Sequence, residues 1–257
     1  MMKTFSLPFG KGTQTVSLDE AHVLYDLHGN PVDAVADEQE AIRQALRHPI
    51  GSAPLKDVVQ AGDTVAIIVS DITRLVYTAQ MLPVIVDELN QAGVRDEQIT
   101  VVTAQGTHRA HRPEEDVIVC GEDMVKRVKV VSHDCRDASQ LTKIGTTTHG
   151  NDVYLDSHVV QADKVILTGA VSFHPMAGFG GGRKAVLPGV ASYETIMRNH
   201  AMALTDTFGG GCNPRCETSL LEDNPLHDDM KQAAALLNPC FLVNTVFSAD
   251  GDLYEVV

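Results

Sequence analysis

Three features are scarce in this sequence of 257 residues, and the first is positive charge. Lysine and arginine together number 20, against 34 aspartate and glutamate residues, which gives a formal net charge of −14. A chain with no basic surplus cannot neutralise a phosphate backbone, so the composition excludes nucleic-acid binding. A small anionic ligand stays compatible with this composition if the few cations gather at one site.

Long apolar runs are also missing. No stretch approaches the roughly 20 consecutive apolar residues that a membrane-spanning helix requires. The segment Met1–Gly10 contains no apolar run of the kind found at the centre of a signal peptide. We therefore expect no membrane partner and a cytoplasmic location.

Cysteine occurs only five times, at spacings that fit no disulfide framework. Reduced thiols in a cytoplasmic protein are the simplest interpretation. Cys212 and Cys216 could suggest a metal site, but zinc sites usually add a second pair of ligands at short spacing, and none follows. We interpret these two residues as free thiols in a glycine-rich loop.

What the chain does contain is a regular alternation of strand and helix patterns. The segment from Lys3 to about Val32 alternates apolar and polar residues and is expected to be β-rich. Beyond it, the patterns predict strands at 65–69, 99–104, 128–132, 164–168 and 240–246, and helices at 38–47, 79–92, 113–119, 192–203 and 228–237. This order predicts an α/β fold: a mostly parallel, Rossmann-like sheet with helices on both faces and a β-rich N-terminal extension, in one domain over residues 1–257.

Polar motifs follow three of the predicted strands, at residues 70–74, 105–109 and 169–175. Ligands of open α/β sheets bind outside the carboxyl ends of the strands. We therefore expect the charged side chains of these motifs to converge on one cleft: Asp71, Arg74, His108, Arg109 and His174. Each motif alone has a structural explanation, since Asp71 and Thr73 could cap a helix and His108 and Arg109 could lie in a solvated loop. Three motifs at one edge favour a site.

The glycine loop, Gly-Phe-Gly-Gly-Gly-Arg-Lys at residues 178–184, is a second signal. Consecutive glycine amides can cradle an anion such as phosphate, so Gly180, Gly181, Gly182 and Arg183 are candidate contacts to a phosphate-bearing ligand. The loop is not a Walker A motif, because alanine follows the lysine, and Pro188-Gly189 separates it from the next helix, unlike a dinucleotide fingerprint.

Lys184 and His200 each leave two roles open. Lys184 could be a counter-charge for phosphate or a nucleophile whose pKa neighbouring cations lower. His200 lies near the end of a predicted helix, where a histidine often serves only as a partner of the helix dipole. The remaining histidines that we considered carry no comparable context and are interpreted as surface or structural: His111, His133, His149, His158 and His227.

Together these motifs resemble the nickel-pincer-nucleotide-dependent lactate racemase family. The matching pieces are Ser-Asp-Ile-Thr-Arg at 70–74, Gly-Thr-His-Arg at 106–109, the run from Phe-His-Pro at 173–175 through the glycine loop to Pro188-Gly189, Asn-His at 199–200, and Asn-Pro at 224–225 with Asp-Met at 229–230. The chain departs from the family at two flanking positions, Leu75 and Ala110, where the family usually has proline. Family members also continue into a second domain that closes over the cleft, and this second domain is absent from the present chain.

The resemblance implies a cofactor, pyridinium-3-thioamide-5-thiocarboxylic acid mononucleotide, which holds nickel as a pincer. It implies a covalent link from this cofactor to Lys184, a nickel ligand in His200, and a phosphate seat in the glycine loop. Asp71, Thr73 and Arg74 would contact the nucleotide. Planar four-coordinate geometry suits nickel(II), and imidazole is a suitable ligand for it.

The activity that the resemblance implies is racemisation or epimerisation of a small 2-hydroxy acid, by reversible hydride transfer to the cofactor. His108 and His174 would be the paired acid and base, because histidine takes and gives protons near neutral pH. Arg109 is a candidate clamp for the substrate carboxylate. The implied partners are the proteins that make the pincer nucleotide and insert nickel.

Two other functions stay open from the sequence. A nicotinamide-dependent 2-hydroxy-acid dehydrogenase would need an acidic residue about 20 residues beyond the glycines, at the end of a second strand. Glu194 and Asp206 lie near that distance, but neither is expected to follow a strand. The third possibility is a non-catalytic nucleotide-binding module.

Overall fold

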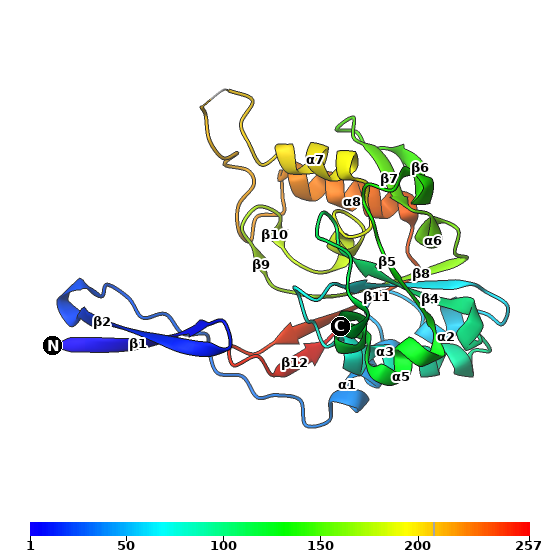
Figure 1. The fold of residues 1–257 in the computed structure, drawn as a ribbon, viewed down its shortest axis with the longest axis horizontal. Helices are drawn as coiled ribbons and strands as arrows, with labels where there is room; N and C mark the ends of the chain where they lie inside the picture. The colour runs from blue at the N-terminus through cyan, green and yellow to red at the C-terminus, as the bar shows by residue number, and fades with distance from the viewer. Residues whose placement is uncertain (208) are drawn as a thin grey trace.

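The centre of the computed structural model, which describes residues 1–207 and 209–257, is a six-stranded sheet with the order β12-β11-β8-β3-β4-β5. Five strands run parallel, and β12 at one edge is antiparallel to β11. Their bounds are β3 (Val65–Ser70), β4 (Ile99–Ala104), β5 (Lys129–Ser132), β8 (Lys164–Ala170), β11 (Phe241–Phe247) and β12 (Leu253–Val256). The predicted, mostly parallel sheet is confirmed (Figure 1).

Both faces of the sheet are buried, because the side chains of its central strands β3, β4 and β8 are buried at most positions. In β3, Val65, Ile67 and Val69 enter one hydrophobic core, whereas Ala66 and Ile68 enter a second core on the opposite face. Successive side chains of a strand point to opposite faces, so a continuous apolar run supplies two cores at once.

Helices cover both faces, as predicted. The first core is closed by α1 (Glu38–Arg47), α2 (Leu55–Val58), α3 (Thr78–Gln91), α4 (Pro113–Cys120) and α5 (Glu122–Arg127). The second is closed by α6 (Ser157–Val160), α7 (Tyr193–Ala201) and α8 (Pro225–Leu237), together with a hairpin of β6 (Leu141–Thr146) and β7 (Asp152–Asp156). Short 3-10 turns occupy η1 (Glu20–His22), η2 (Asp96–Gln98) and η3 (Ala138–Gln140).

Side-chain caps set the helix boundaries. The hydroxyl of Ser192 accepts the amide of Thr195, so α7 begins at Tyr193, one residue after the predicted start. The prediction for α8 began three residues late, at 228. Asn224 caps this helix and Pro225 takes its first position, where proline suits the helix because its missing N–H would have no partner there.

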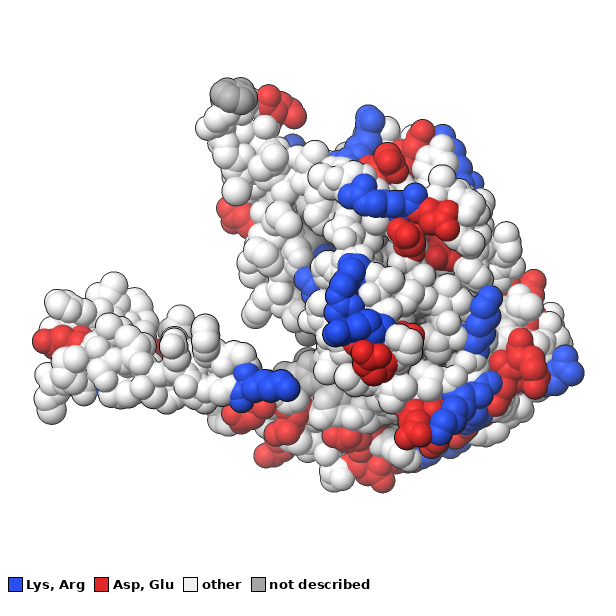
Figure 2. Space-filling model, viewed as in Figure 1, with Lys and Arg blue, Asp and Glu red and all other residues white. Residues whose placement is uncertain are grey.

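The N-terminal extension is an arm, a hairpin of β1 (Met2–Phe9) and β2 (Gly12–Asp19) that projects from the body of the molecule (Figure 1). The β-structure ends at Asp19, and residues 23–37 are irregular, so the β-rich prediction to Val32 was too long. In Figure 2 the arm carries few charged side chains compared with the body. Within the described residues, no helix is long and apolar enough to cross a membrane.

Candidate active site

A cavity of about 330 Å³ lies at the carboxyl ends of β3, β4 and β8. The polar motifs that follow these three strands meet there, together with part of the glycine loop and one face of α7. The predicted site residues that line the cavity are Asp71, Arg74, His108, His174, Gly180, Gly181, Lys184 and His200. Thr73, Arg109, Gly182 and Arg183 do not belong to its lining.

Asp71 organises the first two motifs. It is buried just after β3, where its Oδ1 accepts hydrogen bonds from the Thr73 hydroxyl at 2.6 Å and the Thr73 amide at 3.2 Å. Its Oδ2 lies 2.6 Å from Nδ1 of His108, in the loop after β4. A carboxylate only accepts hydrogen bonds, so Nδ1 of His108 carries a hydrogen, and in the neutral ring the lone pair is on Nε2. Thr73 therefore stabilises the turn after β3, while Asp71 orients His108.

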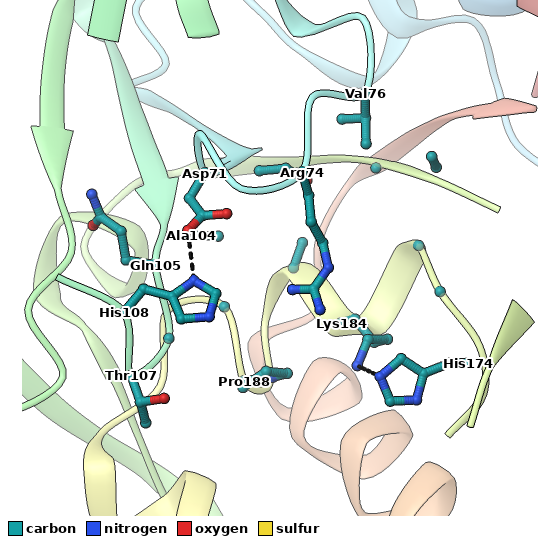
Figure 3. Close-up of a pocket in the computed structure, with 18 of the residues that line it drawn as sticks. Asp71, Arg74, Val76, Ala104, Gln105, Thr107, His108, His174, Lys184 and Pro188 are labelled. Atoms are coloured by element: carbon teal, nitrogen blue, oxygen red, sulfur yellow. Dashed lines mark hydrogen bonds and ion pairs between the residues drawn. The ribbon is translucent and has the colours of Figure 1, made fainter. Parts of the chain in front are cut away.

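His108 is 46% exposed at its side chain, so its Nε2 is accessible from the cavity. Figure 3 shows the Arg74 side chain between His108 on one side and His174 on the other. The backbone amide of Arg74 donates to the carbonyl of Asp71 at 3.0 Å, which closes the turn after β3. The cavity is thus flanked by two imidazoles with a guanidinium between them.

His174 and Lys184 form the other side of the cavity. His174 belongs to the two-residue strand β9 (Phe173–His174), and its Nε2 lies 3.4 Å from Nζ of Lys184 in η4 (Gly182–Ala185). Burial, followed by the charges of Lys184 and Arg74, lowers the pKa of His174 to about 4. Burial, followed by the charges of Arg74 and Arg183, lowers the pKa of Lys184 to about 8. A lysine with such a pKa is a candidate nucleophile.

The glycine loop begins with β10 (Gly178–Phe179) and packs tightly against the end of β8. Gly181 has a φ of +72°, and a Cβ there would lie 2.8 Å from Oδ1 of Asn244 and 2.9 Å from the carbonyl oxygen of Ala170. The amide of Gly182 donates to the same Asn244 oxygen at 3.2 Å. Close packing therefore requires glycine in the middle of this loop, whatever ligand it receives.

Arg183 points away from the cavity. Its Nη2 donates to the carbonyl oxygens of Ala177 at 2.7 Å and Phe179 at 3.1 Å, and so joins the two ends of the loop. Burial lowers the pKa of Arg183. The cavity lining does not include Arg183 or Gly182, which the sequence placed as ligand contacts: Nη2 of Arg183 is bonded to backbone carbonyls and the amide of Gly182 to Asn244.

His200 enters the cavity from α7. Its Nδ1 lies 3.0 Å from the carbonyl oxygen of Ile196, one turn earlier in the same helix. A carbonyl oxygen accepts, so Nδ1 carries the hydrogen and Nε2 keeps a lone pair. Burial, followed by the charge of Lys184, lowers the pKa of His200, which keeps the ring neutral. A neutral imidazole with one free nitrogen is the form that binds metal ions.

Arg109 is directed elsewhere. Its Nη1 and Nη2 each lie 2.7 Å from a carboxylate oxygen of Glu115 in α4, and its side chain is 60% exposed. This bidentate pair holds the guanidinium outside the cavity. The expectation that Arg109 clamps a substrate carboxylate is therefore not supported by its position, and Arg74 is the guanidinium that lines the cavity.

A buried hydrogen-bond network centred on Asp229 holds α7 against α8. Asp229 of α8 accepts hydrogen bonds from the Thr147 hydroxyl at 2.6 Å, the Asn151 side-chain amide at 2.9 Å and the Asn199 side-chain amide at 2.8 Å. Asn199 directly precedes His200. The Asn199 and Asp229 motifs of the sequence thus serve the framework of the site, not its lining.

One framework residue was missed from the sequence. Asn244 supports the glycine loop from β11, and a signal for it existed, since asparagine is rare in the middle of an apolar strand. His111 was interpreted as surface or structural, and its position fits the structural role: its side chain is buried, and its Nε2 accepts a hydrogen bond from the amide of Ile72 at 2.9 Å. No cluster of three or more His, Cys, Asp or Glu side chains suited to a metal ion occurs within residues 1–207 and 209–257.

Fold and cavity together define an α/β domain with a small cavity at the carboxyl edge of its sheet, lined by histidines and a partly buried lysine. The family described as the lactate racemase N-terminal domain matches residues 9–209, and the chain belongs to this family.

The chain is similar to two lactate racemases. It is 34% identical over 255 residues to that of Lactiplantibacillus plantarum, covering 97% of this chain and 58% of that protein. It is 31% identical over 250 residues to that of Thermoanaerobacterium thermosaccharolyticum, covering 96% and 57%. The chain thus spans less than two thirds of the length of these relatives.

Two solved structures are also similar to the chain. The lactate racemase apoprotein from T. thermosaccharolyticum superposes with a TM-score of 0.83 at 30% identity, over 99% of this chain and 58% of that one. A protein from Thermotoga maritima, a structural genomics target, superposes with a TM-score of 0.67 at 21% identity, over 90% of this chain and 55% of that one. The second likeness shows a shared fold.

Proposed function

We propose that this chain is the cofactor-binding catalytic domain of a racemase for lactate or a similar small 2-hydroxy acid. One observation carries the proposal: a single cavity brings together two histidines, a buried lysine and a third histidine from four separate segments. Membership of the lactate racemase N-terminal domain family gives this arrangement its reaction class.

The cavity residues fit a nickel pincer nucleotide. Lys184 offers an amine that is uncharged in a large fraction of molecules near pH 8, as a covalent link requires. His200 offers Nε2 of a neutral ring whose other nitrogen is fixed by a backbone carbonyl, the arrangement found around metal-binding histidines. The cavity volume of about 330 Å³ falls at the lower end of small-ligand sites.

In this proposal Lys184 holds the cofactor covalently and His200 contributes a nickel ligand. The absence of a three-residue metal cluster among the described side chains suits a metal whose other donors come from the cofactor. When bound, the nickel pincer nucleotide supplies an acceptor for the hydrogen on the reacting carbon of the substrate.

Arg74 and the two histidines would handle the substrate. The guanidinium of Arg74 lies between the imidazoles, where it can hold the substrate carboxylate with the hydroxyl-bearing carbon between the two rings. His108 Nε2 would take up the hydroxyl proton, because Asp71 fixes the tautomer and stabilises the imidazolium that results. His174 would meet the substrate oxygen on the other side.

We further propose a cytoplasmic location and partnership with the proteins that make the pincer nucleotide and insert nickel. All five cysteines carry free thiols, in keeping with a reducing compartment. Of the five, only Cys212 is exposed, and four are at least partly buried.

The experiment that tests the proposal is an intact-mass measurement. The chain is expressed with the proteins that build and load the cofactor, and a nickel-containing adduct is expected on the wild type and lost in Lys184→Ala. Lys126→Ala, which alters an exposed lysine paired with Glu122, is the control and should keep the adduct. An adduct that survives Lys184→Ala, or reversible NAD binding without any adduct, would overturn the assignment.

Three further variants separate the roles of the histidines in the loaded enzyme. His200→Ala should lose nickel, measured by metal analysis of the purified protein. His108→Ala and His174→Ala should keep nickel and lose lactate racemisation, followed by chiral chromatography. Metal-free protein from either of the last two variants contradicts this division of roles.

A further inference from the structure

The loop after β4 contacts the turn after β3 (residues 71–74) at two points. Nδ1 of His108 lies 2.6 Å from Oδ2 of Asp71, and Nε2 of His111 lies 2.9 Å from the backbone nitrogen of Ile72. His108 belongs to the cavity lining, whereas His111 lies outside it and has a side chain that is only 1% exposed. The proposed function gives a task to the first of these histidines and none to the second.

The hydrogen-bond partners of His111 define the form of its ring. A backbone N–H only donates, so Nε2 of His111 accepts from Ile72. Nδ1 lies 2.9 Å from Oδ1 of Asp116, and since a carboxylate accepts, Nδ1 carries the hydrogen. A neutral ring with its hydrogen on Nδ1 satisfies both contacts at once. The imidazole therefore links a carboxylate of α4 to a backbone amide of the turn.

The first turn of α4 holds the segment that carries this ring. Glu115 accepts hydrogen bonds from Nη1 and Nη2 of Arg109, each at 2.7 Å. It also accepts the backbone amide of Arg112 at 2.8 Å and Nη2 of the same residue at 2.9 Å. Asp116, the next residue of the helix, accepts His111. The segment is thus fixed to α4, and His111 extends that attachment to the turn after β3.

The turn presents two groups to the cavity, Asp71 and Arg74, and Ile72 lies between them in the chain. The backbone amide of Arg74 donates to the carbonyl of Asp71 at 3.0 Å, so the residues of the turn are coupled. A shift of Ile72 would therefore displace both groups. Hydrogen bonds weaken steeply when their geometry is lost, and a misplacement of about 1 Å can cost an enzyme about 10²-fold in rate.

We propose that His111 is a positioning residue for the reaction at this site, because it holds the turn after β3 in place. In that position Asp71 meets Nδ1 of His108, and Arg74 faces the cavity (Figure 3). His111 acts through the backbone amide of Ile72 and contacts no ligand itself. This inference rests on the proposed function, because the turn affects turnover only if the cavity is the active site.

Two substitutions separate the two contacts of the ring. Glutamine extends about as far as Nε2 of histidine, so in His111→Gln the side-chain carbonyl can still accept the amide of Ile72. Asparagine extends only about as far as Nδ1, so His111→Asn can still reach Asp116 but leaves the amide of Ile72 without its acceptor. His149→Asn is the control, because it alters a histidine whose Nε2 lies 2.8 Å from Asp228 of α8, outside the site.

Nuclear magnetic resonance tests the positioning on the chain itself, labelled with 15N-isoleucine and 15N-histidine. Ile72→Val and His108→Gln assign the signals. In His111→Asn, we expect the amide of Ile72 to exchange with solvent at least about tenfold faster than in the wild type, which corresponds to about 1.4 kcal/mol of protection. The 15N signals of the His108 ring should change in the same variant. In His111→Gln and His149→Asn, the exchange rate should stay within about threefold of the wild type and the ring signals should stay unchanged.

Two outcomes would overturn the inference. The first is a folded His111→Asn in which neither the exchange of Ile72 nor the signals of His108 change, even if the free energy of unfolding falls. The second serves if His111→Asn does not fold: a folded His111→Gln that loses the protection of Ile72 yet keeps the signals of His108 as in the wild type. A purely structural residue would lower stability without altering the His108 ring in the folded state.

The loaded enzyme provides a second readout. His111→Asn should retain nickel and lose about tenfold or more in kcat/KM for lactate, whereas His111→Gln should stay within about threefold of the wild type. Equal loss in the two variants, with nickel retained, would contradict a role through Ile72. The resonance measurements need no turnover. A turn held by His111 in a loaded chain that does not racemise lactate would count against the proposed function alone.

Discussion

Substitution of Gly181 by alanine tests why the glycine loop contains glycine. The residue has a φ of +72°, and an added Cβ would lie 2.8 Å from Oδ1 of Asn244 and 2.9 Å from the carbonyl oxygen of Ala170. The carbonyl belongs to β8, a central strand of the sheet, and cannot move aside. Gly51 provides a matched control, because it has the same φ of +72° and no atom within 4 Å of an added Cβ.

The loss of unfolding free energy in Gly181→Ala and in Gly51→Ala should differ only by the steric overlap of the added Cβ at Gly181. Both variants acquire an L-residue in the left-handed region, at about 1–2 kcal/mol, and both reduce the entropy of the unfolded chain equally. Gly181→Ala adds overpacking, at about 1–3 kcal/mol. Gly181→Ala should therefore lower the free energy of unfolding by about 1–3 kcal/mol more than Gly51→Ala.

Urea denaturation followed by circular dichroism measures both free energies from the midpoint and slope of each transition. Equal destabilisation of the two variants would refute the packing argument, because it would mean that the loop accommodates a Cβ against β8. The glycine would then be explained by its positive φ or by the approach of a ligand, and not by packing against β8.

Three more predictions follow from charge and burial. Lys184, with a pKa lowered to about 8, should react half-maximally with an amine reagent near pH 8, and peptide mass mapping that finds reaction only above pH 10 would contradict the low pKa. Arg74→Ala should raise the KM for lactate in the loaded enzyme by tenfold or more, as expected for a lost charge-assisted hydrogen bond worth about 1.5–3 kcal/mol. Arg109→Ala should leave the KM unchanged. The opposite result would mean that Arg109 binds the substrate carboxylate. Burial raises the pKa of Asp156, but the hydrogen bonds from His133 and His158 and the charge of His133 together outweigh it and lower the pKa overall. Its stabilisation is therefore present above the unfolded pKa near 4 and is lost as the pH falls through the lower folded pKa. Asp156→Asn should therefore reduce the drop in urea midpoint between pH 6 and pH 3.5, and an undiminished drop would assign acid sensitivity to other carboxyls.

The parallel sheet and the place of the site could be predicted from sequence, because both depend on local pattern. A continuous apolar run marks a strand buried on two faces, and the polar residues that follow it mark the end where ligands bind. Asp71, His108 and His174 were found in this way, since each follows such a run directly. The hairpin of β6 and β7 was missed because its short strands carry mixed burial and resemble loop.

Side-chain direction could not be predicted, because it depends on partners that only the fold supplies. Arg109 and Arg183 both looked like ligand contacts beside polar motifs. Arg109 pairs with Glu115 of α4. Arg183 donates hydrogen bonds to the carbonyl oxygens of Ala177 and Phe179. A charged residue next to a site serves the framework whenever a nearer acceptor is present.

The buried carboxylate of Asp229 has a consequence for the proposed nickel site. Its hydrogen bonds to Asn199, Asn151 and Thr147 join α7, α8 and the β6–β7 hairpin beneath His200. The imidazole of His200 is therefore held in position without a metal, so metal binding would not require free energy to order α7. If His200 binds nickel as proposed, the affinity would depend in part on Asp229, which contacts the helix and not the cavity.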